Sequence, residues 1–267
     1  MIQILWSRRY ADFRRATLIV GLLLIPFFSF AACWAVPSAV SGELEQHSTA
    51  FRGGSDGLVR LFENLSPSVG ALYTKGDSGD LGVICTVTVI ERAEGRTVLL
   101  TAAHCARRSV SYMVTLDGRR FYAARVWKLP PEEINPEKGQ RPYGQPKVDM
   151  ALFVVDEELP VSPVPIGVAV LVAPGRAVVT VGFPLGVTKV RYRGIVAGLL
   201  ERPGSDLDGY LILQIFGAPG SSGSAVIDEA TGTIVGVLVS GKQEQAGLPV
   251  IFATPVGYQR FLQAVYP

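Results

Sequence analysis

The sequence VICTVTVIERAEGRTVLLTAAHC, residues 83–105, contains two runs rich in β-branched and apolar residues. They cover Val83–Glu91 and Thr97–Thr101, and Glu94-Gly95 between them is typical of a tight turn. This pattern predicts two strands joined by a short turn. The second strand leads directly into His104, so a titratable side chain follows a rigid apolar segment.

Runs of the same kind recur across the rest of the chain, and no long amphipathic helix is expected between them. Asp117-Gly118 between two of them is a hairpin signal. About a dozen short strands without intervening helices predict an all-β fold of packed antiparallel barrels or a sandwich. The other predicted strands are Val69–Tyr73, Val110–Leu116, Phe121–Leu129, Met150–Val155, Ala177–Gly182, Lys189–Leu200, Leu211–Ile215, Ser224–Asp228, Thr233–Ser240 and Val250–Val256.

Two further segments differ from this pattern. Residues 129–148 are polar and rich in proline, which predicts a long surface loop. Gly257–Val265 has apolar residues at helical spacing and predicts a short C-terminal helix.

Composition excludes several classes of protein. The chain has 267 residues, of which 48% are hydrophobic and 18% charged, so it is not a disordered chain. Its net charge of +2 gives no case for a nucleic-acid partner. It holds 2 histidines and 3 cysteines that are not clustered in the sequence. We therefore expect no Cys/His metal site and no cofactor.

The N-terminus has the pattern of a membrane-targeting segment. Thr17–Val36 is almost wholly apolar and follows four arginines between residues 8 and 15. About 20 apolar residues can span a bilayer, and basic residues before them keep the N-terminus in the cytoplasm. An uncleaved anchor, a cleaved signal ending near Ala39 and lipidation at Cys33 all remain open. Each exports the residues after about 40 to the periplasm or the exterior, with membrane contact if the segment is uncleaved.

The chain therefore divides into three parts. Residues 1–40 form the signal peptide or signal anchor, and residues 41–57, which are polar and rich in glycine and serine, form a linker. Residues 58–267 form one exported domain.

Three short motifs in that domain carry groups suited to catalysis. His104 follows a strand, and the only other histidine, His47, lies in the linker. Asp149 opens an apolar strand, where a carboxylate could orient an imidazole. A loop of small residues at 217–226 holds Ser221, Ser222 and Ser224 and permits a tight turn. Each motif alone also fits a purely structural role, but the order His, Asp, Ser is one of three known for such a triad.

The residues around these motifs resemble the trypsin/chymotrypsin-like serine proteases, from about Leu58 to Pro267. The similarity is carried by TAAHC at 101–105, DMALF at 149–153 and GSSGSAV at 220–226. VGFPLG at 181–186 and RGIVAG at 193–198 are more similar to bacterial, HtrA-type members. The resemblance implies two packed six-stranded antiparallel β-barrels, and we expect no PDZ domain after Pro267.

The resemblance also implies a role for each matching residue. Ser222 would be the nucleophile, His104 the general base and then acid, and Asp149 the group that orients His104. The N–H groups of Gly220 and Ser222 would form the oxyanion hole. Ser221 and Ser224 are the competing candidates for the nucleophile. In addition, Cys85 and Cys105 occupy places where the family forms a disulfide.

Two departures from trypsin itself bear on activation and specificity. In trypsins that are activated by N-terminal cleavage, an aspartate at the place of Ser221 pairs with the new α-amino group. This chain has a serine there, so we expect an enzyme that needs no such cleavage. The residues at the specificity pocket carry no acid, which argues against cleavage after Arg or Lys and favours an apolar or small side chain. Lys242 near the rim leaves an acidic preference open. The pocket residues implied by the resemblance are Phe216, Val239, Ser240, Gly241 and Val250.

Together these features predict an exported serine endopeptidase that acts on proteins or peptides through an acyl-enzyme. The alternative is a catalytically silent trypsin-like domain that binds peptides or partner proteins at the cell envelope.

Overall fold

The structure is a computed structural model, which describes residues 55–75, 81–106, 111–129, 148–167, 172–201, 209–243 and 249–256. These residues form one α-helix, α1, three short 3-10 helices and twelve strands. The helices are α1 (Ser55–Leu65), η1 (Ser66–Ser68), η2 (Ala103–Cys105) and η4 (Pro184–Gly186). The strands are β1 (Val69–Lys75), β2 (Leu81–Ala93), β3 (Arg96–Thr101), β4 (Tyr112–Thr115), β5 (Tyr122–Lys128), β6 (Ala151–Val155), β7 (Ala177–Gly182), β8 (Val190–Leu199), β9 (Leu211–Gln214), β10 (Ala225–Asp228), β11 (Ile234–Gln243) and β12 (Pro249–Pro255).

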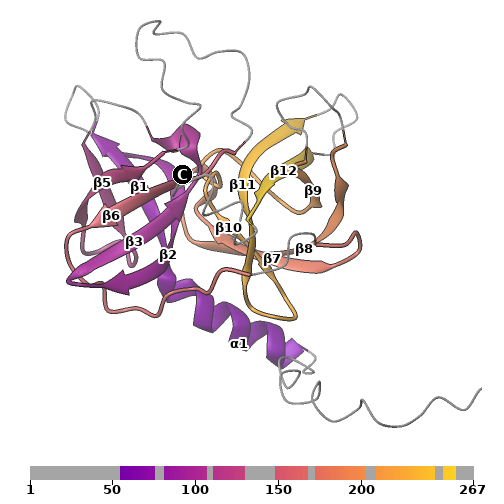
Figure 1. Ribbon diagram of the computed structural model, residues 1–267, viewed down its shortest axis with the longest axis horizontal. Helices are drawn as coiled ribbons and strands as arrows, with labels where there is room; N and C mark the ends of the chain where they lie inside the picture. The colour runs from indigo at the N-terminus through magenta and orange to yellow at the C-terminus, as the bar shows by residue number, and fades with distance from the viewer. Residues whose placement is uncertain are drawn as a thin grey trace, which may run out of the picture. The chain divides into compact units, whose positions relative to one another are not determined.

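The strands close into two barrels of six antiparallel strands each. The first, barrel 1, has the order β1-β2-β3-β6-β5-β4, and the second, barrel 2, has the order β10-β11-β12-β9-β8-β7. Figure 1 shows them as two groups of strands, one from each half of the chain. Because both sheets close on themselves, neither leaves an unpaired edge strand. The all-β fold and the two six-stranded barrels expected from the sequence are confirmed.

Alternating apolar residues fill the barrels. In barrel 1, Val87, Leu99 and Leu152 come from three neighbouring strands and are fully buried. In barrel 2, Val178 and Val226 are equally buried. Burial of this kind contributes roughly 25 cal/mol for each Å² of apolar surface removed from water. The strands were predicted as short runs rich in β-branched and apolar residues, and every observed strand lies within three residues of its predicted bounds.

Two predicted turns also have the expected geometry. Glu94 and Gly95 both have positive φ, at 54° and 74°, which matches a two-residue hairpin turn. Asp117 accepts hydrogen bonds from the N–H groups of Arg119 and Arg120, and Gly118 has a φ of 76°. Residues 1–40, most of the linker, most of the loop at 129–148 and the C-terminal helix at 257–265 lie outside the described residues.

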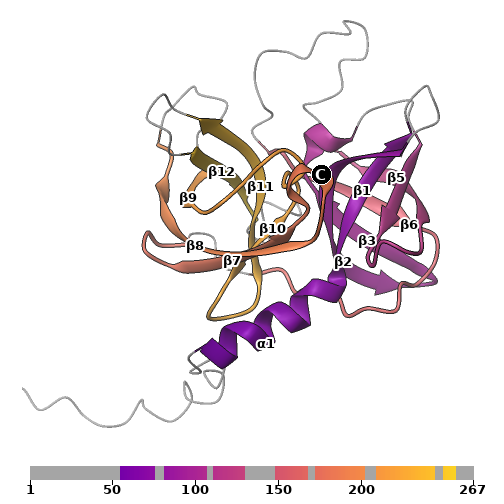
Figure 2. The ribbon, with the colours of Figure 1, turned by 180° about the vertical axis from the view of Figure 1, so that it is seen from behind.

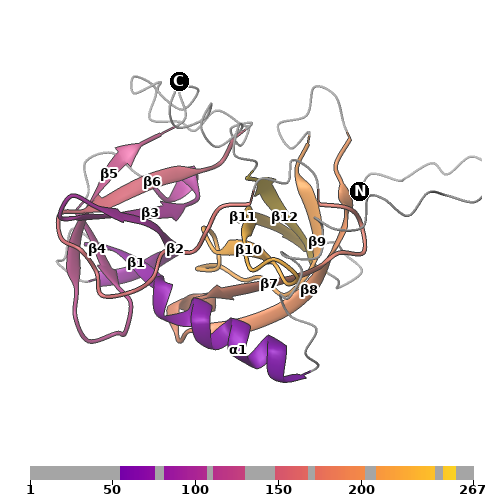
Figure 3. The same ribbon diagram turned by 60° about the horizontal axis from the view of Figure 1, so that its bottom comes forward.

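The helix α1 was not anticipated by the sequence analysis, and its first three residues fall in the range assigned to the linker. Gly57, Leu61 and Leu65 recur every four residues and are buried, so α1 packs by one narrow stripe. Figures 2 and 3 show it outside both barrels, with its end leading into β1. No helix in the described part of the chain has the length and apolar character needed to cross a membrane.

The residue that follows α1, Ser66, is held by two cations near the start of β8. The Lys189 ammonium donates to the carbonyls of Ser66 and Leu116, at 2.6 Å and 2.9 Å. The Arg191 side chain donates to the Ser66 hydroxyl at 2.8 Å. Burial, with the Arg191 charge adding to it, lowers the pKa of Lys189 to about 8. These contacts tie the entry to barrel 1 to a strand of barrel 2.

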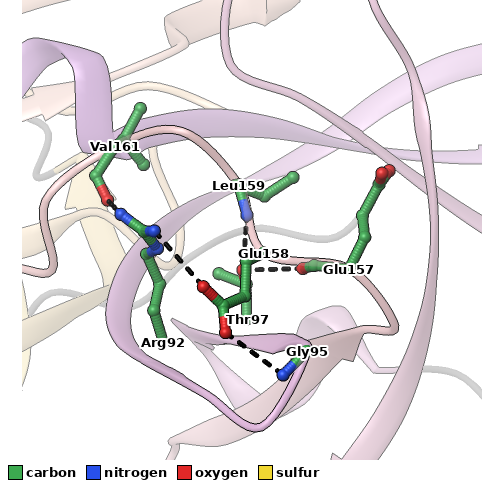
Figure 4. A network of polar contacts seen from close by, with 7 residues as sticks. All are labelled: Arg92, Gly95, Thr97, Glu157, Glu158, Leu159 and Val161. Atoms are coloured by element: carbon green, nitrogen blue, oxygen red, sulfur yellow. Dashed lines mark hydrogen bonds and ion pairs between the residues drawn. The ribbon is translucent and has the colours of Figure 1, made fainter.

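A polar network holds the segment that leaves barrel 1 after β6 (Figure 4). The Thr97 hydroxyl donates to the Glu157 carbonyl and accepts from the Leu159 N–H, both at 2.9 Å. The Arg92 guanidinium donates to the Val161 carbonyl and pairs with Glu158. The crossing toward barrel 2 is therefore fixed on the β2–β3 hairpin.

A disulfide joins Cys85 of β2 to Cys105 of η2, with 6.2 Å between the α-carbons. The resemblance implied this bond, and it is confirmed. Both cysteines are buried in the barrel 1 core, so the bond closes a 20-residue separation inside packed structure. On the chain-entropy account, a loop of this length stabilises the fold by about 3 kcal/mol.

We therefore expect that reducing this disulfide lowers the free energy of unfolding by about 3 kcal/mol, because the unfolded chain regains loop entropy. Chemical denaturation with and without a reductant measures the difference. The variant C85A/C105A is the matched control, since it should show no response to reductant. Equal unfolding free energies for the oxidised and reduced native chain would contradict the expectation.

Candidate active site

His104 lies on η2, immediately after β3, with its side chain 23% exposed. Asp149 is fully buried and contacts His104 twice. One carboxylate oxygen lies 2.7 Å from the ring Nδ1, and the other accepts the His104 backbone N–H at 2.9 Å. The two contacts fix the imidazole plane and favour a proton on Nδ1. Nε2 is then the nitrogen with a lone pair in the neutral ring.

Strand pairing explains why these two residues meet. β3 pairs with β6, and Thr101 lies opposite Ala151 in that register. His104 follows Thr101, and Asp149 precedes Ala151, so both side chains extend from the same end of the strand pair. The sequence analysis named both residues, and the barrel brings them together.

The disulfide lies beside the histidine. A ring nitrogen of His104 and the sulfur atoms of Cys85 and Cys105 lie within 4.8 Å of one another. In the oxidised form the sulfurs bond to each other and present no thiolate ligand. The contact therefore acts as packing that pins the histidine segment to β2.

The serine loop between β9 and β10 turns on two glycines. Gly220 and Gly223 have φ values of 93° and 85°, which side-chain-bearing residues rarely adopt. A β-carbon on Gly220 would collide with the Phe183 carbonyl, and one on Gly223 would collide with the Thr101 hydroxyl. The loop is thus packed against the strand that leads to His104.

The three serines of this loop differ in exposure. Ser221 is 3% exposed and Ser224 is 1% exposed, whereas Ser222 is partly exposed. The Ser221 hydroxyl accepts a hydrogen bond from the Ala218 N–H. The Ser224 hydroxyl has no partner among the described residues. Among the three, Ser222 alone is partly exposed.

Backbone bonds orient the peptide groups around Ser222. The Pro219 carbonyl accepts the Leu185 N–H at 2.6 Å, and the Ser221 carbonyl accepts the Ser224 N–H at 3.0 Å. In a trans peptide the N–H points opposite to the carbonyl. The Gly220 N–H therefore points away from Leu185, and the Ser222 N–H points away from the Ser224 N–H. Within the described segments neither of these two N–H groups donates a hydrogen bond. Backbone N–H groups left available in this way are the kind of donor that can bind an oxyanion.

A main-chain hydrogen bond connects the serine loop to barrel 1. The Thr86 N–H of β2 donates to the Ser222 carbonyl at 2.8 Å. The Gly223 N–H donates to Leu238 of β11, so the loop is also held within barrel 2. The candidate histidine and aspartate come from barrel 1 and the candidate serine from barrel 2, and this bond links the two barrels beside the serine.

The predicted pocket residues lie around barrel 2. The Phe216 side chain is half exposed, and its ring lies 4.9 Å from the ring of Tyr192 on β8. Val239 is 2% exposed in the core, so its side chain faces other apolar residues. Tyr192 was missed in the sequence analysis. Its signal is the alternation of an aromatic residue with two arginines along the predicted strand. Ser240 lies opposite Phe252, Gly241 opposite Ile251 and Val250 opposite Lys242 in the β11–β12 pairing.

Comparison with solved structures identifies the same fold in bacterial proteases. A variant of the HtrA-type protease AlgW with a decapeptide has 20% identity and a TM-score of 0.55, over 74% of this chain and 62% of that one. The same protease with a tripeptide has 22% identity and a TM-score of 0.57, over 77% and 61%. A serine endoprotease from Yersinia pestis has 17% identity and a TM-score of 0.55, over 74% and 61%.

The matched part of this chain therefore corresponds to about three fifths of the length of these structures. At such identities the likeness establishes the fold alone. Among curated protein sequences, no relative matches.

A family comparison adds direct sequence support. The pattern of the family described as "Trypsin-like peptidase domain" matches residues 85–237, more than half of the chain. The matched range begins at Cys85 and includes His104, Asp149 and Ser222. By this match, and in agreement with its two β-barrels, the chain belongs to the trypsin-like peptidase family.

Proposed function

We propose that this protein is an exported serine endopeptidase that cleaves proteins or peptides through an acyl-enzyme on Ser222. The observation that carries the proposal is the buried Asp149 carboxylate bonded to His104, 2.7 Å from Nδ1. A buried carboxylate on an imidazole whose other nitrogen is unused by that pair is the arrangement that general-base catalysis requires. Family membership supports the peptidase class.

The proposed mechanism assigns one task to each group. The Ser222 hydroxyl attacks the substrate carbonyl while His104 Nε2 accepts its proton. Asp149 stabilises the imidazolium that forms. The N–H groups of Gly220 and Ser222 bind the oxyanion, and their peptides need no reorientation because their carbonyls are already held. His104 then protonates the leaving amine, and water hydrolyses the ester by the reverse proton path.

The exposure of the loop serines supports Ser222 over its neighbours. A nucleophile must reach a substrate carbonyl, and the hydroxyls of Ser221 and Ser224 are buried. The Ser221 hydroxyl also accepts a hydrogen bond within its own loop. In trypsins activated by N-terminal cleavage, this position holds an aspartate that pairs with the new N-terminus. The proposed enzyme is therefore active without N-terminal trimming.

We expect a fluorophosphonate probe to label the native protein covalently and S222A not at all, because only an activated serine reacts. The matched control S224A, which removes a buried hydroxyl from the same loop, should still be labelled. D149N should lower kcat by about 10⁴-fold, because the imidazole loses its orienting carboxylate. Mass spectrometry and hydrolysis of a denatured protein substrate provide the two measurements.

Labelling that persists in S222A would show that the nucleophile is elsewhere. The silent binding domain would be supported instead if the native protein were neither labelled nor active, and if the native protein and S222A bound peptides with the same affinity.

For substrate specificity, we propose that an apolar or small side chain precedes the cleaved bond. Phe216 offers a half-exposed aromatic surface beside Tyr192, and neither side chain carries a carboxylate. A basic substrate side chain would be desolvated there without an opposite charge, which is costly. The similar HtrA-type protease binds a decapeptide in one structure and a tripeptide in another, which supports a peptide-binding groove here.

We expect a peptide library to be cleaved mainly after apolar or small residues. The variant F216A should reduce cleavage after large apolar residues by about tenfold relative to small ones, since roughly 1–3 kcal/mol of pocket contact is lost. Mass spectrometry of the cleaved library measures both preferences. Cleavage mainly after Arg or Lys would contradict the proposal.

Export is proposed from the apolar segment at residues 17–36 and its basic flank. The Cys85–Cys105 disulfide supports it, because such bonds persist in oxidising compartments.

We expect protease added to intact spheroplasts of a bacterial host to digest a C-terminal tag on the full chain. An N-terminal tag should be protected if the segment is an anchor and absent from the mature protein if it is cleaved. Immunoblotting measures both tags. Protection of the C-terminal tag until the membrane is lysed would contradict export.

A further inference from the structure

Thr86 is bonded to three segments around the proposed site. It lies on β2 directly after Cys85 and is fully buried. Its hydroxyl donates to the Gly220 carbonyl at 2.9 Å and accepts the Phe183 N–H at 3.1 Å. Its backbone N–H binds the Ser222 carbonyl, and its carbonyl accepts the Thr101 hydroxyl at 2.7 Å. One residue of barrel 1 is thus bonded to the serine loop, the β7–η4 connection and the end of the histidine strand.

The hydroxyl acts at the peptide groups that would bind the oxyanion. Gly220 contributes one proposed oxyanion donor through its N–H, and its carbonyl is held by Thr86. The Pro219 carbonyl before it is held by the Leu185 N–H. Both peptide planes flanking the Gly220 α-carbon are therefore anchored, so the direction of its N–H is set although its φ is 93°. Without a side chain, glycine itself offers little resistance to a change of this angle.

The same hydroxyl couples the two anchors. Phe183 binds the Thr86 oxygen, and two residues later Leu185 binds Pro219. The Thr86 hydroxyl therefore holds the Gly220 carbonyl directly. Through Phe183 it also positions the segment whose Leu185 N–H holds the Pro219 carbonyl. This double role needs a group that is donor and acceptor at once, which serine and threonine supply and valine does not.

The surroundings leave little freedom for a substitute. A β-carbon on Gly182 would lie 3.3 Å from the Thr86 hydroxyl oxygen and would collide with the Ser224 hydroxyl. Valine has nearly the shape of threonine, so it would fit this space. It would, however, leave the Gly220 carbonyl and the Phe183 N–H without their partner in a buried place.

We propose that Thr86 is a positioning residue for the oxyanion hole, acting through the Gly220 carbonyl and the Phe183 N–H. The inference rests on the proposed peptidase function and deepens it. Thr86 touches no substrate atom. Its hydroxyl keeps the Gly220 N–H aimed at the developing oxyanion, so its loss weakens transition-state binding more than substrate binding.

The test compares T86V, T86S and T88V in the full chain, with a peptide substrate cleaved by the native protein. We expect T86V to lower kcat by about 10- to 100-fold with KM within about twofold, since a small displacement of an oxyanion donor acts on the transition state. T86S should restore kcat to within a few-fold. T88V is the matched control, because Thr88 lies on the same strand, is 1% exposed, and has no hydroxyl partner in the described structure. It should match the native protein.

Rates are expressed per site titrated with the fluorophosphonate probe, so that unfolded protein does not count. If T86V does not fold, T86A replaces it. The smaller side chain leaves room for water, and kcat should still fall at least fivefold below that of T86S. A kcat within twofold of native for the folded hydroxyl-free variant, or an equal loss in T88V, would overturn the inference.

Failure of the proposed function shows separately, as a native protein that is neither labelled nor active. In that case a crystal structure of T86V with an unchanged Gly220 conformation would overturn the positioning role, and a rotated Gly220 peptide would support it.

Discussion

The hydrogen bond from the Thr86 N–H to the Ser222 carbonyl is the contact on which the site depends. It crosses from barrel 1 to barrel 2 at 2.8 Å and joins the strand of Cys85 to the loop that carries Ser222. His104 and Asp149 are fixed relative to each other by the β3–β6 pairing, and that relation needs no second barrel. Ser222 has no such local tie to them. The placement of its segment relative to barrel 1 therefore depends on bonds between the barrels.

The two barrels contribute different kinds of rigidity. Closed sheets hold each strand end in place, so residues at the ends of β3 and β6 form a stable pair. The serine loop is held instead by close approach: Gly220 and Gly223 have no room for a β-carbon and adopt positive φ. Glycine adopts positive φ without strain, so the conformation of this loop is set by the neighbours that hold its peptide groups. The surrounding carbonyl contacts hold these groups, and they leave the Gly220 and Ser222 N–H groups available to a ligand.

Some elements of the fold and the candidate site could be predicted from the sequence and others could not, for physical reasons that differ from element to element. Strands were predictable because each is a short run rich in β-branched and apolar residues, and several, such as β6 and β7, are buried along nearly their whole length. The division into two six-stranded barrels came only from the resemblance, and the strand order was not predicted, because pairing between distant strands leaves no local pattern. The helix α1 was missed because its stripe of Gly57, Leu61 and Leu65 is narrow and begins on a glycine. His104 and Asp149 were found from motif and order. Thr86 and Tyr192 were not, because a strand threonine or tyrosine has no local mark of the contacts it makes across the fold.

The central claim is that Ser222 is the nucleophile and that the Gly220 and Ser222 N–H groups receive the oxyanion. A crystal structure of the protein after reaction with a fluorophosphonate tests it most directly. The account predicts a bond from phosphorus to the Ser222 hydroxyl oxygen, with the phosphonyl oxygen about 2.7–3.1 Å from both nitrogens. A phosphonyl group bound to another residue, or an oxygen turned away from both N–H groups, would contradict it.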